Sequence, residues 1–343
     1  MNNSHSNNTK CRIIVDAMGG DFAPQNSVIG AIEAYNEKKC FDLFLVGKEN
    51  EILNVISKNN LTFDKKFIIN TQEVIEMGET PTIALKKKPN SSLSIGATWV
   101  RDKKADAFVS AGNTGAMMAA STLIIGRIPG VGRPTIGAEM PNVNGICFLY
   151  DVGAGKDAKP NHLFEYSVMA SIYAREMGGI ENPSIGILSM GEEEGKGNEV
   201  AEEAAKLLKA SKLNFIGNVE GRDILNGKAD IVVVDGFIGN IILKFGESFV
   251  NFLKSRVRSY ANESFLNKLK ALITKKVFKD SLRDMDYETH GGVPLLGVNG
   301  ISIIGHGSSS PLAIKNMVLK ANDMFQKDLI NKLKEGKELY GNL

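Results

Sequence analysis

The sequence is poor in cysteine, in net charge and in long apolar runs, and each shortage excludes a class of protein. Three cysteines, Cys11, Cys40 and Cys147, cannot all pair with one another, so we expect a reducing cytosol and thiols packed in the core. A formal net charge of +2 argues against a general nucleic-acid binder. No apolar run reaches the roughly 18 to 20 residues that a spanning helix requires, so any membrane contact is expected to be peripheral.

Several standard catalytic motifs are missing as well. There is no G-x-S-x-G, H-E-x-x-H or C-x-x-C, and hence no common covalent nucleophile or zinc site. Residues 153–158 fit G-x-G-x-x-A, but no acid follows at the spacing of a dinucleotide site. Residues 191–197 hold a Gly-Lys pair that no Ser or Thr follows, so they are not a P-loop. We therefore expect no metal and no cofactor.

What is present is the composition of a globular enzyme, with 43% hydrophobic and 23% charged residues. Short apolar runs alternate with amphipathic stretches, which is typical of βα units in a doubly wound, mostly parallel sheet. We found no repeat or linker, so we expect a polar tail over residues 1–10 and one α/β domain over 11–335. The predicted strands cover residues 11–15, 41–46, 67–70, 107–109, 146–150, 184–189, 214–216, 231–234 and 301–304.

Residues 249–282 differ from this pattern, because apolar residues recur there at helical spacing over a length well above that of a mean helix. Two helices that project from the sheet are expected. Within this stretch, residues 254–279 carry eight basic side chains against the single acid Glu263, a local net charge of +7. Dimer packing, docking of an acidic protein and contact with an anionic membrane surface all fit an apolar face, and the last two also fit the charge.

Glycine-rich segments follow several of the predicted strands. They include DAMGGD at 16–21, SAGNTGA at 110–116, DVGAGKD at 151–157, DGFIGNIILK at 235–244 and GHGSSS at 305–310. Singly, each is ordinary turn chemistry. Parallel sheets bind ligands at the carboxyl ends of their strands, where these segments fall, so together they predict one ligand site. Of the four histidines, His306 lies between glycines and is the best candidate for chemistry, although a structural role stays open.

The segments IIVDAMGGDFAP, KADAFVSAGNTGA, NFIGNVEGRDILNGKAD, DGFIGN and GVPLLGVNG occur in this order. With them the chain resembles, from about residue 12 to about residue 330, the phosphate acyltransferase family of bacterial phospholipid synthesis, usually called PlsX. The resemblance implies a Rossmann-like α/β/α sandwich. It also implies transfer of a fatty acyl group from acyl carrier protein to inorganic phosphate, giving acyl phosphate. One departure is Gly155, where family members commonly have asparagine.

Phosphate is already anionic at neutral pH, so its attack on a thioester needs little general-base help and no covalent intermediate. The site must instead hold phosphate and donate to the developing oxyanion. We expect the aspartates to fix loops, to pair with a lysine or to cap helices, since carboxylates repel phosphate. The candidate catalytic residues are Asp16, Asn113, Lys196, Asp235, Lys244 and His306. The candidate substrate-binding residues are Gly19, Gly20, Asp21, Ser110, Gly112, Thr114, Gly115, Gly236, Asn240, Gly307 and Ser308.

The resemblance further implies a homodimer and a downstream membrane acyltransferase that consumes the acyl phosphate. Since acyl phosphate is labile and its consumer lies in the membrane, we expect a cytoplasmic enzyme that binds an anionic membrane peripherally through the basic stretch at 254–279. No nucleic acid is expected among the partners. Two alternatives remain open at this point. One is a phosphotransacetylase-like or dehydrogenase-like enzyme of the same broad fold, and the other is an inactive scaffold that binds lipid or protein.

Overall fold

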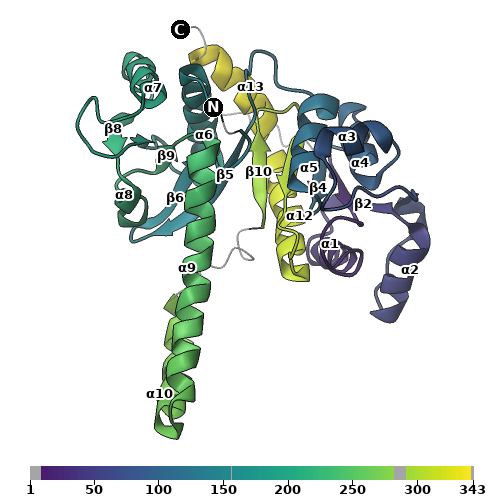
Figure 1. The fold of residues 1–343 in the computed structure, drawn as a ribbon. Coiled ribbons are helices and arrows are strands. Elements are labelled where there is room, and N and C mark those ends of the chain that lie inside the picture. The colour runs from purple at the N-terminus through teal and green to yellow at the C-terminus, as the bar shows by residue number, and fades with distance from the viewer. Residues whose placement is uncertain (1–8, 156, 282–290, 341–343) are drawn as a thin grey trace, which may run out of the picture. The chain divides into compact units, whose positions relative to one another are not determined.

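The computed structural model describes residues 9–155, 157–281 and 291–340 (Figure 1). The chain forms two compact units, Met1–Ile128 with Gly291–Asn331 and Pro129–His290 with Lys332–Leu343. This division was not predicted from the sequence, which shows no change of composition near residue 128. That the two units act as one domain stays a prediction, and most of the expected polar tail lies outside the described residues.

The first unit is built on parallel strands with one antiparallel member. Its strands are β1 (Cys11–Asp16), β2 (Phe41–Gly47), β3 (Ile68–Asn70), β4 (Ala107–Ser110), β10 (Val293–Leu296) and β11 (Ile301–Ile304). They lie in the order β3-β2-β1-β4-β11-β10, and only the β10–β11 pairing among those described here is antiparallel. The chain adds β2 and β3 on one side of β1 and then β4 on the other. The carboxyl ends of β1 and β4 therefore form a switch point, where doubly wound sheets bind ligands.

Helices cover both sides of this sheet. Helices α1 and α12 pack side by side and against β1, while α4 packs against β1, β2 and β4. The apolar runs of the strands supply the core, in which Ile13, Val15 and Phe108 are fully or almost fully buried. The helices are α1 (Gln25–Glu37), α2 (Glu49–Lys58), α3 (Pro81–Lys87), α4 (Ser92–Arg101), α5 (Thr114–Ala120), α12 (Pro311–Gln326) and the start of α13 (Leu329–Tyr340), with shorter helical turns at Lys65–Phe67 and Ser121–Ile125.

The second unit has strands β5 (Thr135–Asn142), β6 (Gly145–Tyr150), β7 (Ile185–Leu188), β8 (Phe215–Val219) and β9 (Ile231–Val233). Their order is β5-β6-β9-β7-β8, with β5 and β6 antiparallel and the other pairs parallel. Strand β9 thus enters between β6 and β7, and the carboxyl ends of β6 and β9 lie together. Its helices are α6 (Pro160–Glu176), α7 (Glu199–Ala210), α8 (Gly221–Asn226), α9 (Gly236–Asn262) and α10 (Phe265–Ser281).

Helices α9 and α10 form a long pair, which we call the arm (Figure 1). Helix α9 has 27 residues, so it is about 40 Å long, and α10 packs back along it. The predicted pair of helices near 249–282 is confirmed up to Ser281, but the first helix begins at Gly236. Residues 235–244 contain two glycines and were interpreted as part of the ligand site at the strand ends. Glycine weakens a helix without forbidding it, and the cap at Asp235 starts this one.

The predicted strands are all found within a few residues, whereas β5 and β10 were missed. Both contain proline, and β5 also contains glycine and glutamate, so neither gives a clear apolar pattern. Among the cysteines, Cys11 and Cys147 are buried as predicted. Cys40 is exposed, so its expected place in the core is wrong. It lies in the turn between α1 and β2, where the chain is at the surface.

Candidate functional site

Asp16 ends β1 and its carboxylate is almost fully enclosed, with 3% of the residue exposed. Its Oδ2 accepts a hydrogen bond from Ser110 Oγ at 2.8 Å, and its Oδ1 accepts one from the Met18 N–H at 3.0 Å. Burial raises the pKa of Asp16, although hydrogen bonds from Ser92 and Ser110 oppose that rise. The carboxylate therefore braces the loop after β1 against the end of β4, as the sequence predicted for a loop-fixing role.

The loops after β1 and β4 approach each other through two glycines. A side chain at position 19 would begin 2.7 Å from the Gly112 nitrogen and 2.8 Å from Ser110 Oγ, so only glycine fits. The Gly112 N–H donates to Ser110 Oγ at 3.1 Å. Gly112 was expected to offer this N–H to a ligand. In the structure this N–H donates within the loop after β4, and the substrate-binding role of Gly112 stays a prediction.

The loop after β11 joins the same place. The Asp21 N–H donates to the Gly307 carbonyl at 2.7 Å, and the Gly305 N–H donates to the Ser110 carbonyl at 2.8 Å. Residues 16–21, 110–115 and 305–308 thus meet at the carboxyl ends of β1, β4 and β11, and we call them the glycine-loop cluster. Three of the predicted segments that are distant in sequence are brought together within one unit.

His306 is the exposed histidine of this cluster, and its hydrogen bonds define which nitrogen carries the proton. The Ser308 N–H points at His306 Nδ1 at 3.2 Å, and Ser308 Oγ lies 2.8 Å from the same nitrogen. A backbone N–H is always a donor, so Nδ1 acts as an acceptor and the neutral ring carries its proton on Nε2. Ser308 consequently orients the His306 ring through Nδ1.

The Asn113 side chain forms hydrogen bonds inside the protein through both groups of its amide. Its Oδ1 accepts from the Ala116 N–H at 3.0 Å and caps α5. Its Nδ2 donates to the carbonyls of Met77 and Glu79 at 2.9 and 3.0 Å. With both kinds of group engaged inside the protein, Asn113 positions the 76–79 segment. The predicted catalytic role of Asn113 stays a prediction. Its neighbour Thr114 is exposed, and Gly115 packs against Pro81.

The remaining predicted residues belong to the second unit. Asp235 caps α9, because its Oδ1 accepts from the N–H groups of Phe237 and Ile238, both at 3.0 Å. The alternative that this aspartate is a helix cap is thereby confirmed. Lys196 and Lys244 are exposed, on the loop after β7 and on α9. The second-unit group comprises Lys196, Asp235, Gly236, Asn240 and Lys244, and the other predicted residues belong to the first unit.

Asp151, at the end of β6, was missed as a site residue although it resembles Asp16 in its setting. It is fully buried, and its Oδ1 accepts from the N–H groups of Ile136, Gly153 and Ala154, while Oδ2 accepts from Gly155. Burial raises the pKa of Asp151, and these four donors oppose that rise. The available signal was an aspartate followed by glycines directly after an apolar strand.

Arg133 was also missed, and its guanidinium lies beside Gly155. A side chain at position 155 would begin 2.3 Å from the Arg133 guanidinium carbon, so the guanidinium occupies the space that an asparagine would need. Arg133 Nη1 donates to the Asp157 carbonyl at 2.8 Å, which fixes it over this turn. A side chain on Gly236 would likewise clash with Asp151 Oδ2. The start of α9 therefore packs against the turn at 151–155.

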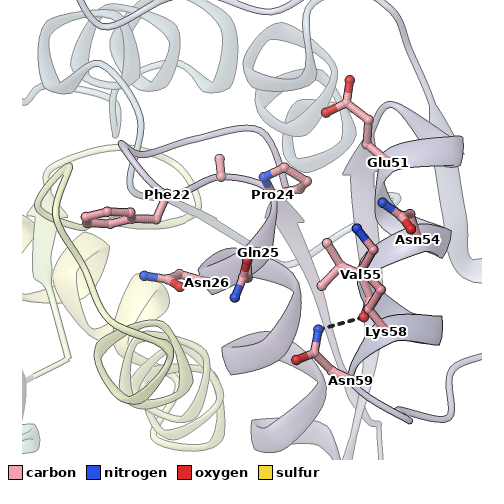
Figure 2. Close-up of a pocket in the computed structure, with 10 residues that line it drawn as sticks. Phe22, Pro24, Gln25, Asn26, Glu51, Asn54, Val55, Lys58 and Asn59 are labelled. Atoms are coloured by element: carbon pink, nitrogen blue, oxygen red, sulfur yellow. Dashed lines mark hydrogen bonds between the residues drawn. The ribbon is translucent and has the colours of Figure 1, made fainter.

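A hollow of about 430 Å³ lies between α1 and α2 in the first unit (Figure 2). Phe22 and Asn26 come from the start of α1 and the turn before it, and Val55, Lys58 and Asn59 come from the end of α2. None of the predicted site residues lines it, although Asp21 directly precedes Phe22. Across the residues that the structure describes, no three His, Cys, Asp or Glu side chains gather as metal ligands would.

The fold that holds these loops is that of the phosphotransacetylases. Among solved structures, it matches a phosphotransacetylase from Streptococcus pyogenes with a TM-score of 0.62 at 20% identity, over 92% of this chain and 94% of the other. It matches the EutD phosphotransacetylase from Staphylococcus aureus with a TM-score of 0.60 at 18% identity, over the same shares. At such identities the likeness concerns the fold alone.

Sequence comparison then gives the family. Residues 11–332 match the family model described as "Fatty acid synthesis protein". The chain is 48% identical to the phosphate acyltransferase of Chlorobaculum parvum, over 92% of this chain and 95% of the relative. It is 41% identical to that of Halothermothrix orenii, over 94% and 98%. This chain belongs to the phosphate acyltransferase family, and the resemblance drawn from its sequence is confirmed.

Proposed function

We propose that this protein transfers a fatty acyl group from acyl carrier protein to inorganic phosphate and releases acyl phosphate. The observation that carries the proposal is the glycine-loop cluster, which lies at the switch point of the sheet in a member of the phosphate acyltransferase family. Three strand ends meet there, and a buried carboxylate braces two of them, those of β1 and β4. Such an arrangement is suited to holding a small polar ligand in a fixed place.

The chemistry needs few groups from the protein. A phosphate oxygen attacks the thioester carbon and forms the new C–O bond, the C–S bond breaks, and the thiolate takes up a proton. Phosphate is an anion at neutral pH, so it needs no base to become a nucleophile. The protein must align phosphate with the carbonyl and donate hydrogen bonds to the oxyanion, each such donor being worth about 3 kcal/mol.

In this mechanism His306 supplies the proton. Ser308 holds the ring through Nδ1, so the proton that His306 can donate is on Nε2. The ring is exposed within the cluster. Donation to the carbonyl oxygen or to the leaving sulfur uses the same N–H. Thr114, which is exposed in the same cluster, is the residue whose hydroxyl we assign as a hydrogen-bond donor to phosphate. Asp16 acts through the loops and does not contact the substrate.

A phosphotransacetylase-like reaction on a coenzyme A thioester is the second candidate, and the likeness of fold favours it. The two candidates share the attack on a thioester and differ in the carrier of the acyl group. A dehydrogenase-like reaction or an inactive scaffold has less support, since the chain lacks a dinucleotide fingerprint and retains the loop cluster.

We further propose that the arm carries two contacts. Phe237, Ile241 and Phe245 are exposed along the first half of α9, and this apolar stretch suits a second copy of the chain in a homodimer. The basic stretch from residue 254 suits reversible binding to an anionic membrane, where the downstream acyltransferase resides. The side chains of Lys275, Lys276 and Lys279 lie outside the described residues. Within those described, no helix is both long and apolar enough to cross a membrane.

Incubation of the purified protein with long-chain acyl carrier protein and phosphate tests the reaction. Acyl phosphate identified by mass spectrometry is the expected result, with no product when phosphate is left out. The same assay with acyl coenzyme A separates the two candidates through the ratio of their kcat/KM values. Release of free fatty acid without acyl phosphate would contradict both.

A further inference from the structure

In the first unit, the chain segment between β3 and α4 exposes a small patch of apolar and basic side chains. Met77 is 44% exposed and Ile83 is 51% exposed, and Lys86 and Lys87 are exposed on the same short helix, α3. Positions 83, 86 and 87 are three and four residues apart, so their side chains share one face of the helix. We call Met77, Ile83, Lys86 and Lys87 the α3 patch.

The backbone under this patch is fixed, although its side chains are exposed. Asn113 Nδ2 holds the carbonyls of Met77 and Glu79, and Pro81 packs against Gly115 at the start of α5. Lys88 Nζ lies 2.6 Å from Glu79 Oε2 and donates to the Val74 carbonyl at 2.7 Å. A surface fixed before binding loses little conformational entropy when a partner docks.

The α3 patch also borders the glycine-loop cluster. A side chain at position 307 would begin 2.8 Å from Met77 Cε, so the methionine methyl group lies directly on Gly307. Gly307 is the residue between His306 and Ser308. A partner that covers Met77 therefore reaches the loop that presents the proposed proton donor.

The charge of the patch indicates the chemistry of that partner. Glu79 neutralises Lys88, whereas α3 itself carries Lys86 and Lys87 and no acid. Glu76 is exposed nearby, so the positive charge is confined to the helix. Two lysines beside exposed methionine and isoleucine suit an acidic protein with an apolar rim, since Met is common at binding surfaces and complementary charge steers association.

We propose that the α3 patch is the docking surface for acyl carrier protein, so that the acyl thioester is delivered over Met77 to the glycine-loop cluster. This proposal rests on the proposed function, which makes an acidic carrier the acyl donor. In this arrangement the arm contacts the membrane and a second copy of the chain, whereas the carrier protein docks on a different surface.

The test is the paired charge reversal Lys86→Glu with Lys87→Glu, compared with Lys38→Glu and Lys39→Glu. The control pair makes the same change of charge at exposed residues after α1, which ends at the amino edge of the sheet. For the α3 variant we expect kcat/KM with acyl carrier protein to fall at least tenfold through KM. We expect kcat/KM with acyl-pantetheine, a thioester without the carrier protein, to stay within twofold. Added salt should lower the wild-type value and affect the variant less.

Binding of carrier protein, measured without phosphate, tests the docking surface without relying on turnover. Weaker binding by the α3 variant and by Ile83→Asp, with unchanged binding by the control, supports the docking surface even if no acyl phosphate forms. Unchanged binding and KM in both α3 variants would overturn the surface while leaving the proposed reaction intact. An equal loss with acyl-pantetheine would also overturn it, because the patch would then act on the catalytic loops. Unchanged melting temperatures exclude misfolding as the cause.

Discussion

In the first unit, the loops after β1, β4 and β11 turn polar groups toward one another. In the second unit, the arm turns apolar groups outward. Asp16 is buried and its oxygens are engaged by Ser110 and Met18, whereas Phe245 on α9 is 71% exposed. A loop of this kind gains its geometry from internal hydrogen bonds and is complete before a ligand arrives. Exposed aromatic side chains on a long helix gain their stabilisation from a partner.

The comparison predicts different consequences for substitutions in the two regions. Changes to the buried, hydrogen-bonded groups of the loop cluster, such as Asp16, should reduce stability and turnover together, because the same bonds set both. Changes on the arm should leave the fold and the chemistry intact and alter only association.

The largest effect is expected for Asp16→Ala. It leaves the Ser110 hydroxyl and the Met18 N–H without their acceptor in a buried place, at a cost of about 2 to 4 kcal/mol in unfolding free energy. Turnover should fall at least about 100-fold, since a loop that moves by an ångström misplaces the reacting groups. Asp64→Ala is the control, because Asp64 is an exposed carboxylate that accepts from the Lys66 N–H. Wild-type turnover in the Asp16 variant would show that the cluster is not the site.

His306→Ala should separate chemistry from stability within the cluster. The ring is exposed, so the melting temperature should change little, while kcat falls about 100-fold through loss of the proton donor. Ser308→Ala removes one of the two contacts to Nδ1 and should lower kcat less, by about tenfold. Steady-state kinetics with saturating phosphate give both values. A kcat within twofold of wild type for His306→Ala would reduce this histidine to a structural residue.

A smaller effect, on stability, is expected for Gly155→Ala in the second unit. The added methyl group would begin 2.3 Å from the Arg133 guanidinium carbon, so Arg133 must leave the Asp157 carbonyl. Because the guanidinium ends a flexible side chain and this hydrogen bond is exposed, the cost should be no more than about 1 kcal/mol. Gly221→Ala is the matched control, because nothing lies within 4 Å of the added group there. Chemical denaturation of both variants measures the difference. Equal stabilities would show that Arg133 moves aside without cost.

The sequence predicted the parallel strands and the strand-end glycine loops because both are local patterns. The run 11–15 is a buried strand by composition, and aspartate and glycines directly after it mark the end of that strand. Contacts between residues that are far apart in the sequence leave no such local pattern. Nothing in the residues around Asn113 shows that its amide holds carbonyls more than thirty positions earlier, and nothing around Gly155 shows that Arg133 occupies the space beside it.

The smallest effect on turnover and the clearest on association is expected for Lys268→Glu with Lys270→Glu on α10, where both residues are exposed. Each lysine near an anionic surface contributes about 1 kcal/mol, and the reversal changes attraction into repulsion. The variant should lose flotation with anionic vesicles at low salt, and wild type should lose it at high salt.

Turnover in solution should stay within twofold of wild type for this variant and for the control pair Lys38→Glu with Lys39→Glu. That control should float as wild type does. Failure of wild type to float on anionic vesicles would contradict the membrane contact. A variant that floats normally but sediments as a monomer would assign the basic stretch to the dimer instead.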